Sequence, residues 1–348
     1  MKGSKRVFGV TLALGIQILS TGMLGVEQPR NFLAGFSKAE AATVVDVRTF
    51  GAKGNGATND TAAIQKAINS LPSTGGTVVI PSGTYGIDAV TSLKLRSNVT
   101  LQMSPTTILG VIPNAAVHYE VLSIGGVSNV NINSGVLWGD RLTHKGTSGE
   151  HGFGVAILGS SNVTVTGTAS NNMWGDGFYI GNGPNFGSSL KTRSTNIKLI
   201  DVSADNNRRQ GISLISGQGI SIVRAKLTNT NGKAPSAGID VEPGSKTDVL
   251  QNISIVDTVT ANNETAGISL SLGVLAGTST PVGITVTNHT DNGSKQGMVI
   301  SGGSGIIPGS IVVNNPTWTN SKTNALAVVA VDYRGFSTTI NNPKVINA

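Results

Sequence analysis

Residues 211–215 read "GISLI", and two similar pentapeptides follow as "GIDVE" (238–242) and "GISLS" (267–271). In each pentapeptide, apolar residues stand at the first and third positions after the glycine. Because side chains on a β-strand alternate between its two faces, this pattern predicts short strands with one buried face. The rest of the aligned set is "GVAIL" (154–158), "GFYIG" (177–181) and "GMVIS" (297–301).

A second strand-like stretch precedes most of these pentapeptides. "NVTVT" begins at Asn162, "NIKLI" at Asn196 and "NISIV" at Asn252, and each begins 15 residues before the next aligned glycine. Repeats of roughly 20 to 35 residues, with two or three short strands in each, are typical of the coils of a solenoid. The sequence therefore predicts an all-β chain folded as a parallel β-helix, in which equivalent apolar residues stack from coil to coil.

The composition agrees with strands joined by many turns. Glycine accounts for 46 of the 348 residues, and charged residues make up only 12% of the chain, a mixture that disfavours helices. One short amphipathic helix is nevertheless expected after Asn59 or Asp60, because Ala63, Ile64, Ala67 and Ile68 form an apolar stripe. We expect this helix to cap the N-terminal end of the solenoid, where open strand edges need cover.

The N-terminus resembles a secretory signal. Basic residues at 2–6 precede an apolar run from Val7 to about Leu24, and a plausible cleavage site follows Ala41. We therefore predict a signal peptide over 1–41 and a single β-helix domain over 42–348, secreted to the extracellular space. No second apolar run approaches membrane-spanning length, so no membrane partner is expected after signal removal. Cysteine is absent, which leaves stability to the core rather than to disulfides.

A family resemblance supports the same fold. The segment "VDVRTFGAKGNGATNDTAAIQKAINSLPSTGGTVVIPSGTY" (45–85) closely resembles the opening of the pectate-lyase-like superfamily of right-handed parallel β-helices. Two further stretches, "NNRRQGISLI" (206–215) and "NTNGKAPSAGIDVEP" (229–243), are similar to secreted bacterial members that act on polysaccharides. The resemblance implies a right-handed solenoid and a polysaccharide partner. It supplies no catalytic set, because the paired Asp-Asp and R-x-K of polygalacturonases and the R-x-P-x-x-R of pectate lyases are missing.

The candidate catalytic residues are carboxylates on one strand. Asp240 and Glu242 flank the inward Val241 and therefore share the outward face of an exposed sheet. Their α-carbons should lie about 6.5–7 Å apart, and glycosidic cleavage commonly uses two carboxyl groups roughly 5 to 9 Å apart. Asp176, directly before the aligned Gly177, is the predicted third member of this group.

Residues around the carboxylates are candidates for substrate binding. Small hydroxyl side chains should flank the acids on adjacent coils, aromatic side chains suit sugar stacking, and cations or histidine suit uronate or hydroxyl groups. The predicted substrate-binding residues are Trp174, Tyr179, Arg208, Arg209, Ser213, Ser269, His151 and Lys246. Each also has a structural interpretation, as a turn or packing residue.

Three functions compete at this point. The leading hypothesis is a hydrolase that cleaves glycosidic bonds with the carboxylate pair; the alternatives are a uronate lyase or C5-epimerase, and a non-catalytic carbohydrate-binding β-helix. Removal of residues 1–41 lowers the formal net charge from +7 to about +4, a mild basic excess that suits an anionic polysaccharide. The lack of a basic run with interleaved aromatics argues against nucleic acid. No metal or cofactor is predicted; calcium is left open, although no motif supports it.

Overall fold

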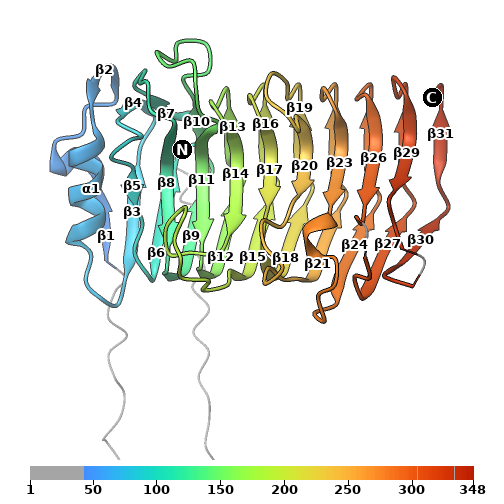
Figure 1. Cartoon of the computed structure of the whole chain (residues 1–348). Helices are drawn as coiled ribbons and strands as arrows, with labels where there is room; N and C mark the ends of the chain where they lie inside the picture. Colours follow the sequence, from blue (N-terminus) through green and yellow to red (C-terminus); the bar gives the residue numbers. More distant parts are fainter. Residues whose placement is uncertain (1–42, 304, 333) are drawn as a thin grey trace, which may run out of the picture. The chain divides into compact units, whose positions relative to one another are not determined.

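The computed structural model describes residues 43–303, 305–332 and 334–348, which wind into coils around a common axis (Figure 1). Consecutive strands enter different sheets, and each strand pairs in parallel with the strand one coil away. Three long sheets therefore form the sides of the solenoid. The chain has a right-handed parallel β-helix fold, which confirms the prediction.

The first sheet contains eleven strands. These are β1 (Val44–Asp46), β3 (Gly76–Ile80), β6 (Val99–Met103), β9 (Ser128–Asn133), β12 (Ser161–Thr166), β15 (Thr195–Ile200), β18 (Gly217–Val223), β21 (Leu250–Val256), β24 (Val282–Thr287), β27 (Gly309–Asn314) and β30 (Ser337–Asn341). The second strand-like stretch of each repeat lies in this sheet.

The second sheet also contains eleven strands, most of them short. These are β2 (Asn55–Asn59), β4 (Gly83–Ile87), β7 (Thr107–Val111), β10 (Val136–Trp138), β13 (Ala169–Asn171), β16 (Ser203–Asp205), β19 (Lys226–Thr228), β22 (Val259–Ala261), β25 (Thr290–Asn292), β28 (Thr317–Thr319) and β31 (Lys344–Ile346).

The third sheet contains nine strands and holds the aligned pentapeptides. These strands are β5 (Leu93–Lys94), β8 (His118–Gly125), β11 (His151–Leu158), β14 (Asp176–Gly181), β17 (Gln210–Leu214), β20 (Ala237–Val241), β23 (Ala266–Ser271), β26 (Gln296–Ser301) and β29 (Asn324–Val329). Two 3-10 turns, η1 (Val47–Phe50) and η2 (Gly273–Leu275), complete the elements together with helix α1 (Thr61–Ser70).

Two columns of stacked apolar side chains run through the interior behind the third sheet. One contains Phe178, Ile212, Ile239, Ile268 and Met298; the other contains Ile180, Leu214, Val241, Leu270 and Ile300; all ten are fully buried. Each column matches the predicted strand register, in which Ile212 pairs with Ile239 and Ile239 with Ile268. The core thus fixes which face of each strand points outward.

The aligned glycines mark places without room for a side chain. A Cβ on Gly177, Gly211, Gly238 or Gly267 would lie 2.5–2.7 Å from the carbonyl oxygen of the equivalent residue on the next coil. Since real Cβ atoms do not approach backbone so closely, a larger residue would push neighbouring coils apart. The repeated glycine is therefore a steric requirement of coil stacking.

Helix α1 takes the place of a third-sheet strand in the first coil and lies at the N-terminal end of the solenoid (Figure 1). Ile64, Ala67 and Ile68 of the expected stripe are buried against the core. Asp60 stands before the helix, but its carboxylate accepts hydrogen bonds from Lys53 N and Gly54 N instead of from the first helical turn.

The predicted signal peptide lies outside the described residues. Among the residues that are described, no helix has both the length and the apolar character needed to cross a membrane.

Candidate functional site

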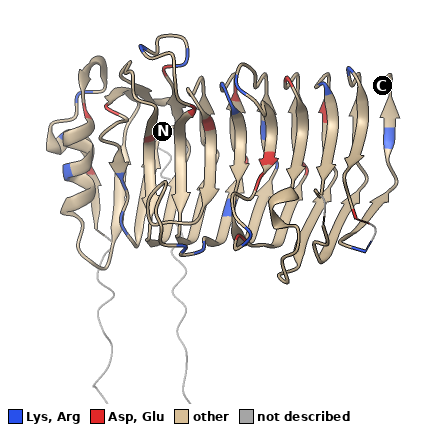
Figure 2. Ribbon diagram, in the orientation of Figure 1, with Lys and Arg blue, Asp and Glu red and all other residues tan. Residues whose placement is uncertain are grey.

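Three acidic side chains meet on the outward face of the third sheet. Asp176 begins β14, Asp240 lies on β20 two coils away, and Glu242 directly follows β20. Figure 2 shows charged residues at many of the turns of the solenoid, whereas Asp176 and Asp240 lie on strands of its third sheet.

Arg209 joins two of these carboxylates. Its Nη1 lies 3.1 Å from Asp176 Oδ2, and its Nη2 lies 3.2 Å from Glu242 Oε2. The Arg209 side chain is only 12% exposed, and its main-chain N–H is bonded to Gly175 O. One planar guanidinium with several donors can hold two carboxylates at once, so Arg209 ties neighbouring coils together across this face.

Asp176 is a buried acid with an incomplete set of partners. Ser213 donates a hydrogen bond from Oγ to Asp176 Oδ2 at 2.8 Å, but Asp176 Oδ1 has no partner. Burial raises the pKa of Asp176 to about 6, although the positive charge of Arg209 and the Ser213 hydrogen bond oppose the shift. Asp176 is therefore easier to protonate than an ordinary aspartate.

Asp240 differs from its predicted setting on an exposed sheet. It points outward, yet it is only 1% exposed because Gln210, Arg209 and Glu242 surround it. Gln210 Nε2 donates to Asp240 Oδ2 at 3.0 Å, while Oδ1 has no partner. Burial, followed by the negative charge of Glu242, raises the pKa of Asp240 well above its usual range, which favours the protonated form of this carboxyl group.

Glu242 is the most accessible of the three acids. Its side chain is 40% exposed, whereas those of Asp176 and Asp240 are buried. On the next coil, Ser269 pairs in register with Asp240 and exchanges a hydrogen bond with Ser271 at 3.1 Å. A buried acid with a raised pKa and an accessible second acid therefore stand side by side, as an acid and base pair requires.

Tyr179 and His151 lie beside the carboxylates in an aromatic cluster. Tyr179 stacks on Phe153 with 4.4 Å between ring centroids, and His151 lies 4.7 Å from Phe186. Burial raises the pKa of Tyr179, so its hydroxyl stays protonated. Burial and then the charge of Arg209 lower the pKa of His151, which favours the neutral imidazole.

Trp174 and Arg208 were expected to contact the sugar, but each has an internal partner. His144 stacks on the Trp174 ring at 4.0 Å, and the Arg208 guanidinium lies 3.7 Å from the centroid of the same ring. Both faces of the indole are thus occupied. Arg208 also donates to Gly149 O at 2.9 Å, so these two residues pack a loop against the solenoid.

Lys246 is exposed and is not joined to the carboxylates by any ion pair among the described residues.

Two residues near the acids were not predicted from the sequence. Gln210 occupies the position equivalent to Asp176 in the next coil, so the alignment of the repeats could have identified it. Phe186 lies in the loop between β14 and β15, outside the repeat, so the alignment of the repeats could not have identified it.

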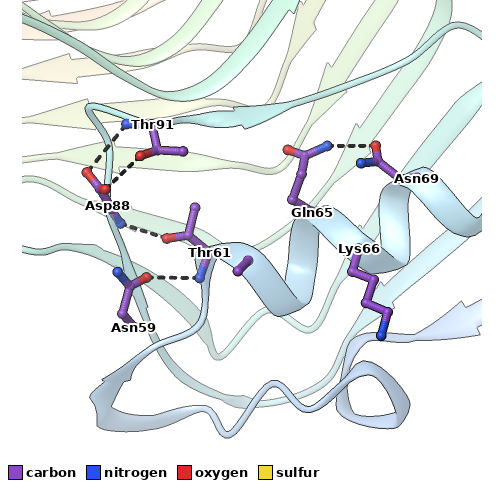
Figure 3. A pocket seen from close by; sticks show the side chains of 8 residues that line it. Asn59, Thr61, Gln65, Lys66, Asn69, Asp88 and Thr91 are labelled. Atoms are coloured by element: carbon purple, nitrogen blue, oxygen red, sulfur yellow. Dashed lines mark hydrogen bonds between the residues drawn. The ribbon is translucent and has the colours of Figure 1, made fainter.

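A hollow of about 610 Å³ lies beside helix α1 (Figure 3), in the first coil and several coils from the acids of the third sheet. Its polar side chains are bonded to one another: Thr91 Oγ1 donates to Asp88 Oδ2 at 2.7 Å, and Gln65 Nε2 donates to Asn69 Oδ1 at 3.0 Å. Asp88 is the only acid that lines it. It lacks the paired carboxyl groups of the site on the third sheet.

Curated proteins resemble this chain over part of their length. A protein of Bacillus subtilis named YclG, described as uncharacterized, is 28% identical over 275 residues, which cover 72% of this chain and 46% of that protein. Alginate lyase 7 of Azotobacter vinelandii is 29% identical over 204 residues, which cover 54% of this chain and 20% of that protein. The chain thus spans less than half of either relative.

Solved structures share the fold at low sequence identity. Iota-carrageenase complexed to iota-carrageenan fragments has a TM-score of 0.65 at 14% identity, covering 88% of this chain and 89% of that one. An exopolygalacturonase of Thermotoga maritima has a TM-score of 0.63 at 15% identity, covering 87% of this chain and 81% of that one. The A-module of an Azotobacter vinelandii mannuronan C-5 epimerase has a TM-score of 0.54 at 18% identity, covering 88% of this chain and 96% of that one.

The family comparison concerns the N-terminal coils. Residues 44–122 match the family described as rhamnogalacturonase A/epimerase, pectate lyase-like. This range contains the whole of the segment 45–85, whose resemblance predicted the superfamily. Residues 44–122 are therefore similar to this pectate lyase-like family, and the described residues share the right-handed parallel β-helix fold of the solved structures.

Proposed function

We propose that this protein is an exported hydrolase that cleaves glycosidic bonds in a polysaccharide. The observation that carries the proposal is the pairing of Asp240, a buried carboxyl group with one unpartnered oxygen, with the accessible Glu242. Buried polar atoms are normally hydrogen-bonded, so an unpartnered oxygen beside a second carboxylate calls for a functional explanation. The fold neighbours named for iota-carrageenan and polygalacturonate support a polysaccharide as the substrate.

The carboxyl groups suit distinct steps of hydrolysis. Asp240, whose pKa is raised by burial and by Glu242, is the acid that donates a proton to the leaving glycosidic oxygen. Glu242 activates water or attacks the sugar from its exposed position. Asp176 anchors Arg209, which in turn orients Glu242. Binding of the sugar chain would supply partners for the carboxyl oxygens that lack them.

A polysaccharide panel tests this proposal. Purified protein is incubated with polygalacturonate, alginate and iota-carrageenan, and new reducing ends are counted. We expect Asp240→Asn and Glu242→Gln to lower the rate by roughly 10²- to 10⁴-fold. Asp257→Asn makes the same chemical change at an exposed turn acid and should retain full activity. Full activity in the Asp240 and Glu242 variants would remove them from the mechanism.

A uronate lyase is the second candidate, and the buried cation Arg209 favours it. In β-elimination, a base removes the C5 proton while a cation neutralises the adjacent carboxylate. Alginate lyase 7, among the relatives, makes this candidate relevant. The same assays distinguish it, since a lyase forms unsaturated products that absorb in the ultraviolet. Sugar binding without any product would instead indicate a non-catalytic protein.

A further inference from the structure

A cleft of about 250 Å³ opens beside the carboxylates, at the ends of β11, β14 and β17. Its lining includes Leu158, Tyr179, Phe186, Lys191, Ile215 and Asp248. Ile215 occupies the position that corresponds to Glu242 on the preceding coil, since Leu214 pairs with Val241. The cleft is therefore the next space along the outward face from Glu242. It is smaller than the roughly 300–1,000 Å³ pockets that hold drug-sized ligands, and suits one sugar ring.

A loop closes this cleft on its N-terminal side. Residues 182–194 leave the repeat after β14, are joined by an antiparallel bridge between Gly183 and Thr192, and pass over the strands before β14. Pro184 O passes where a side chain on Gly125, at the end of β8, would stand. The loop thus crosses two coils of the outward face instead of turning directly into the next strand.

Phe186 fills the face under this loop. Its ring stacks on His118 of β8 with 4.5 Å between centroids and packs against His151 and Phe153 of β11 at 4.7 and 5.3 Å. Phe153 is completely buried as a result. A glycan chain on the third sheet therefore cannot continue past β11 toward the N-terminus.

The opposite direction is open. Ser271 on β23 and Val299 and Ser301 on β26 occupy the same outward face and are partly exposed. From Tyr179 to Asp240 is two coil steps of about 4.8 Å each. That length suits a mono- or disaccharide between the Phe186 ring and the acids, with the rest of the polymer extending over β23 and β26.

The polar groups of the cleft favour an acidic ring. Both carboxyl oxygens of Asp248 are occupied, by Asn182 Nδ2 at 2.6 Å and by the N–H groups of Gly244 and Ser245 at 2.8 Å. Lys191 has no ion-pair partner among the described residues, so its charge is available to a ligand. A carboxylate or sulfate on the sugar would provide that partner.

We propose that this cleft is a chain-end subsite for one acidic sugar ring, so that the protein acts on the ends of an anionic polysaccharide and releases mono- or disaccharides. The inference depends on the proposed function for its cleavage step, but the binding of a chain end does not. Phe186 is the specificity-determining residue, because its ring blocks the path of an internal segment.

Stoichiometry tests chain-end binding without cleavage. Glu242→Gln is mixed with length-fractionated polygalacturonate, alginate and iota-carrageenan, and bound protein per polymer chain is measured by analytical ultracentrifugation. We expect saturation at one protein per chain whatever the chain length, and at least about tenfold weaker binding with the added Lys191→Ala change. Saturation in proportion to chain length would overturn the subsite, and binding to none of the three polymers would overturn both proposals. Polygalacturonate and iota-carrageenan distinguish carboxylate from sulfate recognition.

Product analysis tests whether Phe186 blocks the binding of internal polymer segments. The active protein should release short products while the viscosity of the polymer falls slowly, whereas Phe186→Ala should lower viscosity early and yield mixed lengths. Leu190→Ala, a 62% exposed position on the same loop, is the matched control and should behave like the parent. Phe186→Leu retains bulk and should keep the short products if the alanine variant does not fold. Mixed lengths from the parent would contradict the proposal even though hydrolysis is present.

Discussion

Buried aspartates in two regions of this solenoid differ in how their oxygens are used. Inside the coils, Asp291 accepts hydrogen bonds at Oδ1 from Thr260 Oγ1 (2.7 Å) and Ser294 Oγ (2.6 Å), and at Oδ2 from Ser294 N. On the outward face, Asp176 and Asp240 each leave one buried oxygen without a partner. The interior acid is complete, and the outward acids are not.

The other buried aspartates follow the interior pattern. Asp60, Asp140 and Asp248 have partners on both carboxyl oxygens. Folding therefore satisfies an aspartate where it serves the structure, and only the two acids of the candidate site depart from this rule among the buried aspartates described. A site that must bind and react keeps free hydrogen-bonding capacity at a cost in stability.

The largest expected effect is on catalytic rate and concerns Asp240, one of the two outward acids. Asp240→Asn should lower catalytic rate by roughly 10²- to 10⁴-fold, because the amide cannot donate a proton to the leaving oxygen. The melting temperature should stay equal or rise, since the change removes a buried acid whose charged form is disfavoured. Rate and calorimetric measurements on one preparation check both parts. A matching loss of stability and activity would assign Asp240 a structural role.

A second prediction concerns acid stability in the interior. His289 is fully buried; its Nε2 contacts Thr260 Oγ1 at 2.8 Å, and Trp318 Nε1 donates to its Nδ1 at 3.4 Å. Burial lowers the pKa of His289 to about 3, so the folded state holds it neutral while the unfolded chain protonates it near pH 6.5. Stability from this residue is thus present above pH 6.5 and is lost as pH falls toward 3.

The loss should be measurable by urea unfolding. Between pH 7 and 4.5 the contribution of His289 falls by about 2–3 kcal/mol. His289→Gln removes the titrating group and should flatten this part of the pH dependence, whatever its effect at pH 7. An unchanged slope in the variant would place the acid sensitivity elsewhere.

A third prediction tests the completeness of the interior network. Thr260→Val keeps the side-chain shape but removes the hydroxyl that bonds both Asp291 and His289. The free energy of unfolding should fall by about 1–3 kcal/mol, because two buried groups lose a partner. Activity per folded molecule should not change, as measured by urea titration and rate assays on the same protein. A lost activity at full stability would connect the interior network to the site.

The repeat made the fold predictable, whereas the site needed side-chain detail. Period-2 apolar residues after an aligned glycine predicted both core columns, because identical coils impose identical neighbours. The burial of Asp240 was not predicted, since Gln210 and the Arg209–Glu242 pair cover it through side-chain conformations that alternation does not specify. The stacking of Trp174 on His144 was also missed, because the histidine belongs to a loop outside the repeat.

The smallest expected effect concerns Ser213, which donates a hydrogen bond to the outward acid Asp176. Ser213→Ala removes the only hydroxyl bonded to Asp176, but Arg209 Nη1 remains 3.1 Å from the same oxygen. Stability should therefore change little, in contrast with Thr260→Val. The pKa of Asp176, about 6 in the parent, should rise because the hydrogen bond favours the charged form. If Asp176 must be ionised to hold Arg209, the acid limb of the rate profile should move to higher pH by less than about one unit. A limb that stays in place while Asp176→Asn abolishes it would show that Arg209 alone sets the charge state of this acid.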